Sequence, residues 1–121
     1  MGLSKTEILR GIGFLKGYSI PEIAISGTYR VPISDFDIDL CIFFNTLDIV
    51  NDDAVNIDVY LDGNSARCLR VIQGQNKSMN GTRYRDLVVK NLSAASVVTA
   101  NKIFVTIQKE LGIREQQELI T

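Results

Sequence analysis

The sequence predicts an all-β, mainly antiparallel domain folded as a β-sandwich. Apolar and polar residues alternate over residues 34–45 and again over residues 54–61, which is the period of a strand with one buried face. A turn signal at residues 62–65 (DGNS) precedes another apolar run. The 121 residues, 45% of them apolar, can form one core without disulfides or metals, so we expect a single domain over residues 1–121.

The N-terminal segment, residues 4–16, is compatible with a helix or a strand. Ser4 and Glu7 have the spacing of a capping box, which favours a helix. Gly11 and Gly13 would each cost about 1 kcal/mol inside a helix, which favours a strand. We leave both structures open for this segment.

The central part of the chain predicts an antiparallel meander. Its three strands are residues 34–45, 54–61 and 68–72. A polar loop at residues 51–53 joins the first two, and the turn at residues 62–65 joins the last two.

The C-terminal half predicts two more strands. Residues 74–82 (GQNKSMNGT) are polar and glycine-rich, which indicates a loop before a strand at residues 83–89. Residues 102–108 (KIFVTIQ) are β-branched and aromatic enough for a final strand. Residues 110–121 predict either a short C-terminal helix or a frayed end.

Composition excludes several classes of site. Histidine is absent, which excludes Ser-His-Asp, Cys-His and histidine-based metal chemistry. Cys41 and Cys68 each fall in an apolar stretch and form no CxxC pair, so we expect buried free thiols rather than a disulfide. No apolar run is long enough to cross a bilayer, and residues 1–5 lack the apolar core of a signal peptide. We expect a cytoplasmic protein that binds no membrane.

Charge is sorted along the chain although the net charge is only −1. Residues 31–66 contain eight aspartates and no lysine or arginine, whereas residues 67–90 contain six basic residues against Asp86 alone. This predicts either an acidic site that recruits cations or two oppositely charged faces that neutralise each other within the fold. It does not favour a nucleic-acid surface.

Three aspartates crowd one face of the first predicted strand. Asp35, Asp37 and Asp39 are spaced by two residues, which places neighbours about 7 Å apart. Like charges at that distance repel by roughly 0.6 kcal/mol per pair in water, so we expect a cation opposite them. The cation is either an arginine of the basic segment, such as Arg67 or Arg70, or a hard metal ion such as Ca²⁺.

The same aspartates allow a catalytic hypothesis. Gly27 and Thr28, followed by Asp37, Asp39 and Asp58, resemble the GS…DxD…D arrangement of polymerase-β-like nucleotidyltransferases, whose carboxylates hold two metal ions. The interval between Thr28 and Asp37 is short for that family. Despite this short interval, the arrangement of the aspartates keeps a minimal metal-dependent nucleotidyltransferase as an alternative function.

Four segments of the chain occur in the order, and at about the spacing, of another family. They are residues 3–5 with 27–29, residues 35–39 (DFDID), residues 74–78 (GQNKS) with Gly81, and residues 87–93 with 102–107. On these segments, which span roughly residues 3–110, the chain resembles the TerD-like domains of tellurium-resistance and stress-response proteins. The resemblance implies a calcium-binding β-sandwich without catalytic activity.

The resemblance also implies the ligands of a calcium site. Carried over residue by residue, they are Asp35, Asp37, Asp39, Gly74, Asn76, Ser78 and Asp86. Carboxylate, amide and hydroxyl oxygens suit a hard cation. Gln75 stands where the family has aspartate, and residues 82–85 (TRYR) replace its acidic run. Two arginines beside a divalent ion would repel it, so the site is expected to be weakened or lost.

We therefore expect a non-enzymatic TerD-like stress-response or interaction module. The family's domain continues through further strands, and a sandwich without them would leave an unpaired edge. We expect a second copy of the chain or another protein to cover that edge. An unrelated all-β protein-binding or assembly module is the first alternative, and the nucleotidyltransferase is the second.

Overall fold

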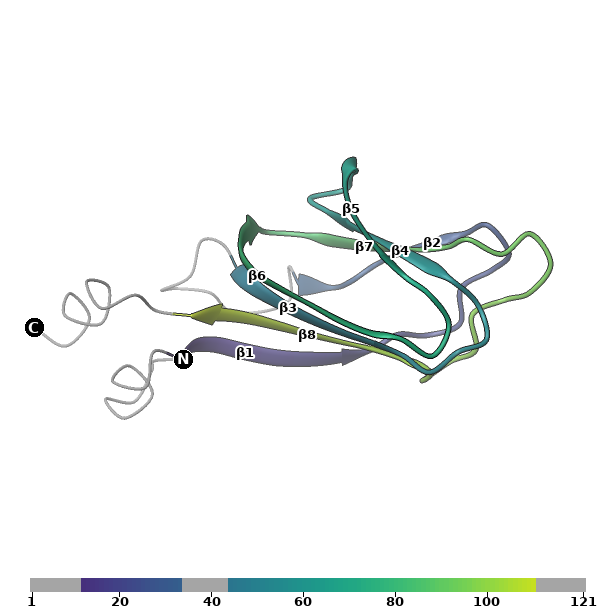
Figure 1. Cartoon of the computed structure of the whole chain (residues 1–121), viewed down its shortest axis with the longest axis horizontal. Helices are drawn as coiled ribbons and strands as arrows, with labels where there is room; N and C mark the ends of the chain where they lie inside the picture. Colours follow the sequence, from purple (N-terminus) through teal and green to yellow (C-terminus); the bar gives the residue numbers. More distant parts are fainter. Residues whose placement is uncertain (1–11, 34–43, 111–121) are drawn as a thin grey trace, which may run out of the picture.

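Two four-stranded antiparallel sheets form a β-sandwich (Figure 1). The computed structural model describes residues 12–33 and 44–110. The predicted all-β sandwich is confirmed for these ranges. They contain no helix long and apolar enough to cross a membrane.

Each sheet has its own strand order. The first sheet has the order β1-β8-β3-β6, formed by β1 (Ile12–Ser19), β8 (Ile103–Glu110), β3 (Phe44–Asn51) and β6 (Asn76–Tyr84). The second has the order β2-β7-β4-β5, formed by β2 (Thr28–Arg30), β7 (Leu87–Asn91), β4 (Ile57–Leu61) and β5 (Asn64–Val71). All neighbouring strands pair antiparallel.

The antiparallel order gathers the connections at two ends of the sandwich. One end, which we call the loop end, consists of residues 20–27, 52–56, 72–75 and 92–102, and it lies at the right of Figure 1. The opposite end, which we call the hairpin end, holds the turns between β4 and β5 and between β6 and β7.

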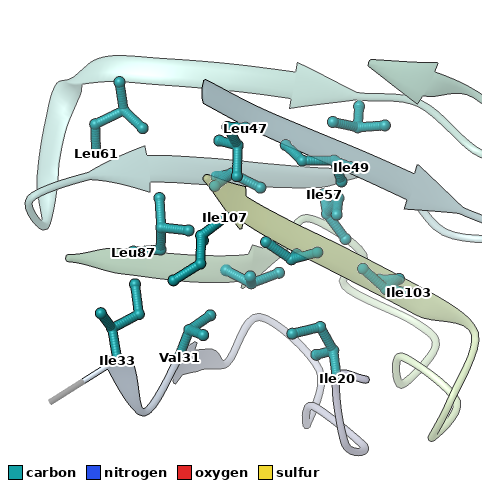
Figure 2. Close-up of a cluster of buried hydrophobic side chains, with 14 of the residues drawn as sticks. Ile20, Val31, Ile33, Leu47, Ile49, Ile57, Leu61, Leu87, Ile103 and Ile107 are labelled. Carbon is teal, nitrogen blue, oxygen red and sulfur yellow. The ribbon is translucent and has the colours of Figure 1, made fainter. Parts of the chain in front are cut away.

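The core lies between the sheets because successive side chains of a strand point to opposite faces. Figure 2 shows Leu47, Ile49 and Ile107 of the first sheet facing Ile57 and Leu87 of the second. The buried apolar residues are mostly β-branched, which suits the pleated surface. Burying each of these large side chains stabilises the fold by roughly 1.5–3 kcal/mol.

The hairpin between β4 and β5 confirms the predicted turn. Asp62 and Gly63 both have positive φ values, 57° and 68°. A type I′ turn requires this conformation at both central residues, and Asp-Gly is among the pairs that adopt it most readily. The strand predictions at residues 68–72 and 102–108 correspond to β5 and β8.

The predicted loop at residues 74–82 is wrong, because β6 begins at Asn76. This strand lies at the edge of the first sheet, and Asn76, Ser78 and Asn80 are exposed while Lys77 and Met79 are half-buried. An edge strand with a solvated face is polar, so its composition resembles that of a loop.

The predicted meander is only partly right. Strands β4 and β5 pair, but β3 and β4 belong to different sheets, so residues 52–56 cross the sandwich. Strand β4 begins at Ile57 rather than at residue 54, and a turn at residues 85–86 divides the strand predicted over residues 83–89.

The N-terminal strand is described from Ile12 onward, so the strand alternative holds for that part of the segment. The rest of it, most of the strand predicted over residues 34–45, and the helix or frayed end predicted after Glu110 lie outside the described residues. Cys68 is a free cysteine, as predicted, but it is exposed on the outer face of β5, so its predicted burial is wrong. Cys41 lies outside the described residues.

Candidate functional site

Four of the residues predicted to bind calcium are described by the structure, and they are spread along β6 and its two flanking turns. Asp35, Asp37 and Asp39 lie outside the described residues. Gly74 occupies the β5–β6 turn at the loop end, with φ of +72°. Asp86 follows β6 at the hairpin end. The nine residues of β6 separate these two by roughly 25 Å, so the structure does not bring Gly74 and Asp86 together.

Ser78 and Asn76 lie between those two positions, on the exposed face of β6. Ser78 is paired in register with Asp48 of β3, and its hydroxyl donates a hydrogen bond of 2.5 Å to Asp48 Oδ1. Asp48 was not among the predicted ligands. Residues 12–33 and 44–110 contain no group of three or more cysteine, aspartate or glutamate side chains that could hold a metal ion.

Asp86, another predicted ligand, belongs to a polar network at the hairpin end. Its Oδ2 lies 2.7 Å from Arg30 Nη2, and its Oδ1 accepts a hydrogen bond from the Leu87 backbone N–H. Its own backbone N–H and that of Arg85 donate to Asp62 Oδ1. The carboxylate of Asp86 is therefore already paired with a guanidinium.

Asp62 is the centre of that network. Burial raises its pKa, but the two backbone N–H groups and the guanidinium of Arg67 outweigh burial and hold the pKa below its ordinary value. Arg67 Nη1 lies 2.8 Å from Asp62 Oδ2, and Arg67 Nη2 donates to the carbonyl of Arg83. Arg67 thereby connects the edge strands β5 and β6.

Asp58 is paired in the same way on the outer face of the second sheet. Its Oδ1 and Oδ2 accept hydrogen bonds from Arg70 Nε and Nη2, at 2.9 and 3.1 Å. The two arginines expected opposite Asp35, Asp37 and Asp39 therefore pair with Asp58 and Asp62. In the described residues, acidic and basic segments neutralise each other within the fold.

A hollow of about 470 Å³ opens at the loop end. Its lining comes from three connections and consists of Ala54, Val55, Asn56, Ile72, Gln73, Leu92, Ser93 and Ser96. Ile72 is 48% exposed, and two more large aliphatic residues of the loop end, Ile25 and Val97, are 47% and 40% exposed. Binding residues are commonly carried by loops on a rigid scaffold, so this hollow is the candidate functional site.

Asn51, at the end of β3, ties down one side of the hollow. It is fully buried, and its amide nitrogen donates to the carbonyls of Val55, Val71 and Ile72 at 3.0–3.3 Å. Its Oδ1 accepts from the backbone N–H of Asp53 at 3.0 Å. One side chain therefore connects the β3–β4 and β5–β6 connections.

Asn91, at the end of β7, does the same on the other side. It is also fully buried, and its amide nitrogen donates to the carbonyls of Ile23, Ala24 and Ser96 at 2.9–3.4 Å. Its Oδ1 accepts from the backbone N–H of Ser93 at 2.9 Å. The β1–β2 and β7–β8 connections are thereby joined.

Two further contacts join these halves. Asp53 Oδ2 accepts a hydrogen bond from the backbone N–H of Thr99 at 2.6 Å. The backbone carbonyl of Asn56 accepts a hydrogen bond from the backbone N–H of Leu92 at 3.1 Å. All four connections of the loop end are therefore cross-linked by hydrogen bonds. A site held in this way needs little ordering when a ligand binds.

Sequence reasoning missed this site because its lining is assembled from distant segments. No motif marks it. The available signal was weak: Ile72 and Val97 are large aliphatic residues placed in or beside connections rich in serine, glycine and asparagine. Comparisons of the chain with protein-family models, with curated proteins and with solved structures found no significant match.

Proposed function

We propose that the chain is a non-enzymatic interaction module that binds a protein partner through the loop end. The observation that carries the proposal is the hollow, which is lined in part by the exposed side chain of Ile72 and held by cross-linked connections. An exposed apolar side chain within a preformed concavity is typical of a binding surface.

The distribution of exposed apolar side chains supports the same end of the molecule. Among the described residues with an assigned burial, 16–33 and 44–109, four large apolar residues are exposed, and Ile25, Ile72 and Val97 all belong to the loop end. The fourth, Phe104, stands on the outer face of the first sheet. The carboxylates of Asp58, Asp62 and Asp86 each form an ion pair with an arginine of the same chain, so they stabilise the fold and are not the groups on which the proposal rests.

Partner capture from a lysate of the source cells tests the proposal by comparison of variants. Ile72→Asp places a charge at the hollow, and Phe104→Asp is the matched control on a different face. Circular dichroism and thermal melting first establish that both variants fold. We expect the proteins retained by the wild type to be retained by Phe104→Asp and lost by Ile72→Asp. Retention that depends on Phe104 and not on Ile72 would contradict the proposal.

The partner can also be a second copy of the chain. Sedimentation velocity over a range of concentrations distinguishes this outcome, because a dimer formed through the loop end must dissociate in Ile72→Asp. A dimer that persists in Ile72→Asp would place the self-association surface elsewhere.

Calcium is the ligand that the resemblance to TerD-like domains adds to this proposal. Thermal melting with and without CaCl₂ tests it, because an ion that binds the folded chain alone raises the melting temperature. Because Arg83 and Arg85 replace the acidic run of the family, we expect at most a small rise in the wild type, and any rise should disappear in the Asp37→Asn/Asp39→Asn double variant. If calcium causes no rise in melting temperature, the calcium part of the proposal is wrong and the proposal of protein binding is unaffected. A rise with nucleotide and Mg²⁺ alone would favour the nucleotidyltransferase.

A further inference from the structure

The hollow at the loop end is lined without charge. None of its eight lining residues is acidic or basic. Asp53 lies next to the lining residue Ala54, but it is only 9% exposed, and its two carboxylate oxygens accept the backbone N–H groups of Ala54 and Thr99. A charged ligand group would meet no opposite charge among these residues, so the lining favours an uncharged ligand.

The lining supplies polar groups suited to a peptide backbone. Within the described part of the chain, the Gln73 side chain, the Ser96 hydroxyl and the Asn56 amide nitrogen make no hydrogen bond to protein. The Asn56 side chain is oriented, because its Oδ1 accepts the backbone N–H of Gln73 at 2.9 Å. A primary amide offers donors and an acceptor together, which complements the N–H and C=O of a peptide group.

The remaining lining is aliphatic. Ile72 is half exposed, and Leu92 and Val55 extend the apolar surface into the hollow. Covering such surface by an aliphatic side chain is favourable in proportion to the area removed from water. No aromatic ring lines the hollow, so it lacks the stacking platform on which nucleobases are held.

The geometry points to a short, uncharged peptide segment of the partner as the occupant of the hollow, and we propose that this segment carries an aliphatic side chain against Ile72. This inference rests on the proposed function, namely that the loop end binds protein. The volume of about 470 Å³ lies within the range of preformed ligand sites, and the cross-linked connections keep it open before binding.

Peptide display on the immobilised chain tests the inference. A phage library of short random peptides is selected on the wild type and counter-selected on Ser96→Trp, which fills the hollow. Ala94→Trp is the matched control, because residue 94 is exposed on the same connection but does not line the hollow. We expect uncharged sequences with a shared aliphatic position, bound at least about tenfold more weakly by Ser96→Trp and equally well by Ala94→Trp.

Gln73→Ala keeps the shape of the connection and removes one amide, so it tests the backbone contacts separately. We expect a loss of affinity of several-fold, on the order of one hydrogen bond. Binding of the selected peptides is measured by fluorescence anisotropy for all four proteins.

Three results would overturn the inference. They are enrichment of charged peptides, no enrichment over Ser96→Trp, and binding of oligosaccharides on a glycan array that Ser96→Trp abolishes. If peptides fail while partner capture still depends on Ile72, the proposed function stands and only the nature of the bound segment is wrong. If capture does not depend on Ile72, both proposals fall.

Discussion

Arg70 donates hydrogen bonds from Nε and Nη2 to the two carboxylate oxygens of Asp58 across the β4–β5 pair. The two side chains therefore form a bidentate ion pair on the outer face of the second sheet. The partners differ in exposure: 7% of the Asp58 side chain is accessible, against 64% of the Arg70 side chain. The guanidinium therefore covers the carboxylate. The hydrogen bonds from Arg70 lower the pKa of Asp58, although burial acts in the opposite direction.

Acid should weaken the fold through this pair. Because the folded pKa of Asp58 lies below its unfolded value of 3.8, its contribution to stability is complete above the unfolded pKa and is lost as the pH falls through the folded pKa. We expect Asp58→Asn to unfold more easily at neutral pH and to show a shallower loss of stability below about pH 4. Urea unfolding across this pH range measures both effects.

The control for acid unfolding is Asp52→Asn. Asp52 is exposed, and its side chain makes no hydrogen bond or ion pair within the described ranges. This variant should follow the wild type. A pH dependence in Asp58→Asn as steep as that of the wild type would show that the pair does not contribute. Some slope is expected to remain, because the pKa of Asp62 is lowered as well.

Cys68 should report on the same carboxylate. Although Cys68 is an exposed residue, partial desolvation raises the pKa of its thiol, and the charge of Asp58 raises it further. Since the thiolate is the reactive form, alkylation of the folded chain should be slower than that of the unfolded chain near pH 8. In a Cys41→Ser background, we expect Asp58→Asn to shift the pH–rate profile of iodoacetamide labelling to lower pH. An unchanged or raised midpoint would contradict this assignment.

Asn51 and Asn91 should each contribute to stability far more than an exposed asparagine. Asn51→Ala and Asn91→Ala leave buried backbone groups without their hydrogen-bond partner, which costs about 1–3 kcal/mol. Asn76→Ala, on the exposed face of β6, should change the free energy of unfolding by no more than about 0.5 kcal/mol. Urea unfolding of the three variants makes the comparison. Equal effects would mean that the two buried asparagines do not hold the loop end together.

Phe104 covers Gly17 of the neighbouring strand. A Cβ atom at Gly17 would lie 2.6 Å from the Cζ of the Phe104 ring, so the ring occupies the space that a side chain would need. Rings placed over a strand glycine shield its backbone, and we expect Phe104→Ala to cost about 0.5–1 kcal/mol. Gly17→Ala should displace the ring, so Phe104→Ala should cost less in that background. A double-mutant cycle with no coupling would refute the contact.

The local elements of the fold were predictable where a few adjacent residues decide them. The Asp62-Gly63 turn was predictable because it needs two positive φ values, and β8 because Ile103, Val105 and Ile107 are β-branched and alternate. Strand β6 was not, because its polar side chains are explained only by its place at the edge of a sheet. The sequence did not show that residues 52–56 cross from the first sheet to the second, because that depends on which sheet β4 pairs in.

The charge pattern was informative in kind but not in detail. Sorting of acidic and basic residues indicated neutralisation within the fold, which the described residues show. The choice of Asp58 for Arg70 follows from the β4–β5 register, which places the two residues opposite each other. The placement of Asp35, Asp37 and Asp39 stays a prediction.

Taken alone, the sequence determined that the described part of this chain is built of strands and that the turn at Asp62-Gly63 is tight, because alternation and turn conformation depend on neighbouring residues. It also determined that histidine-based chemistry is absent. Only the tertiary structure decided how the strands pair, which edge is polar, and where the hollow opens. Those features depend on which apolar faces meet, and the lining from Ala54 to Ser96 is brought together by buried asparagines that in the sequence resemble ordinary loop residues.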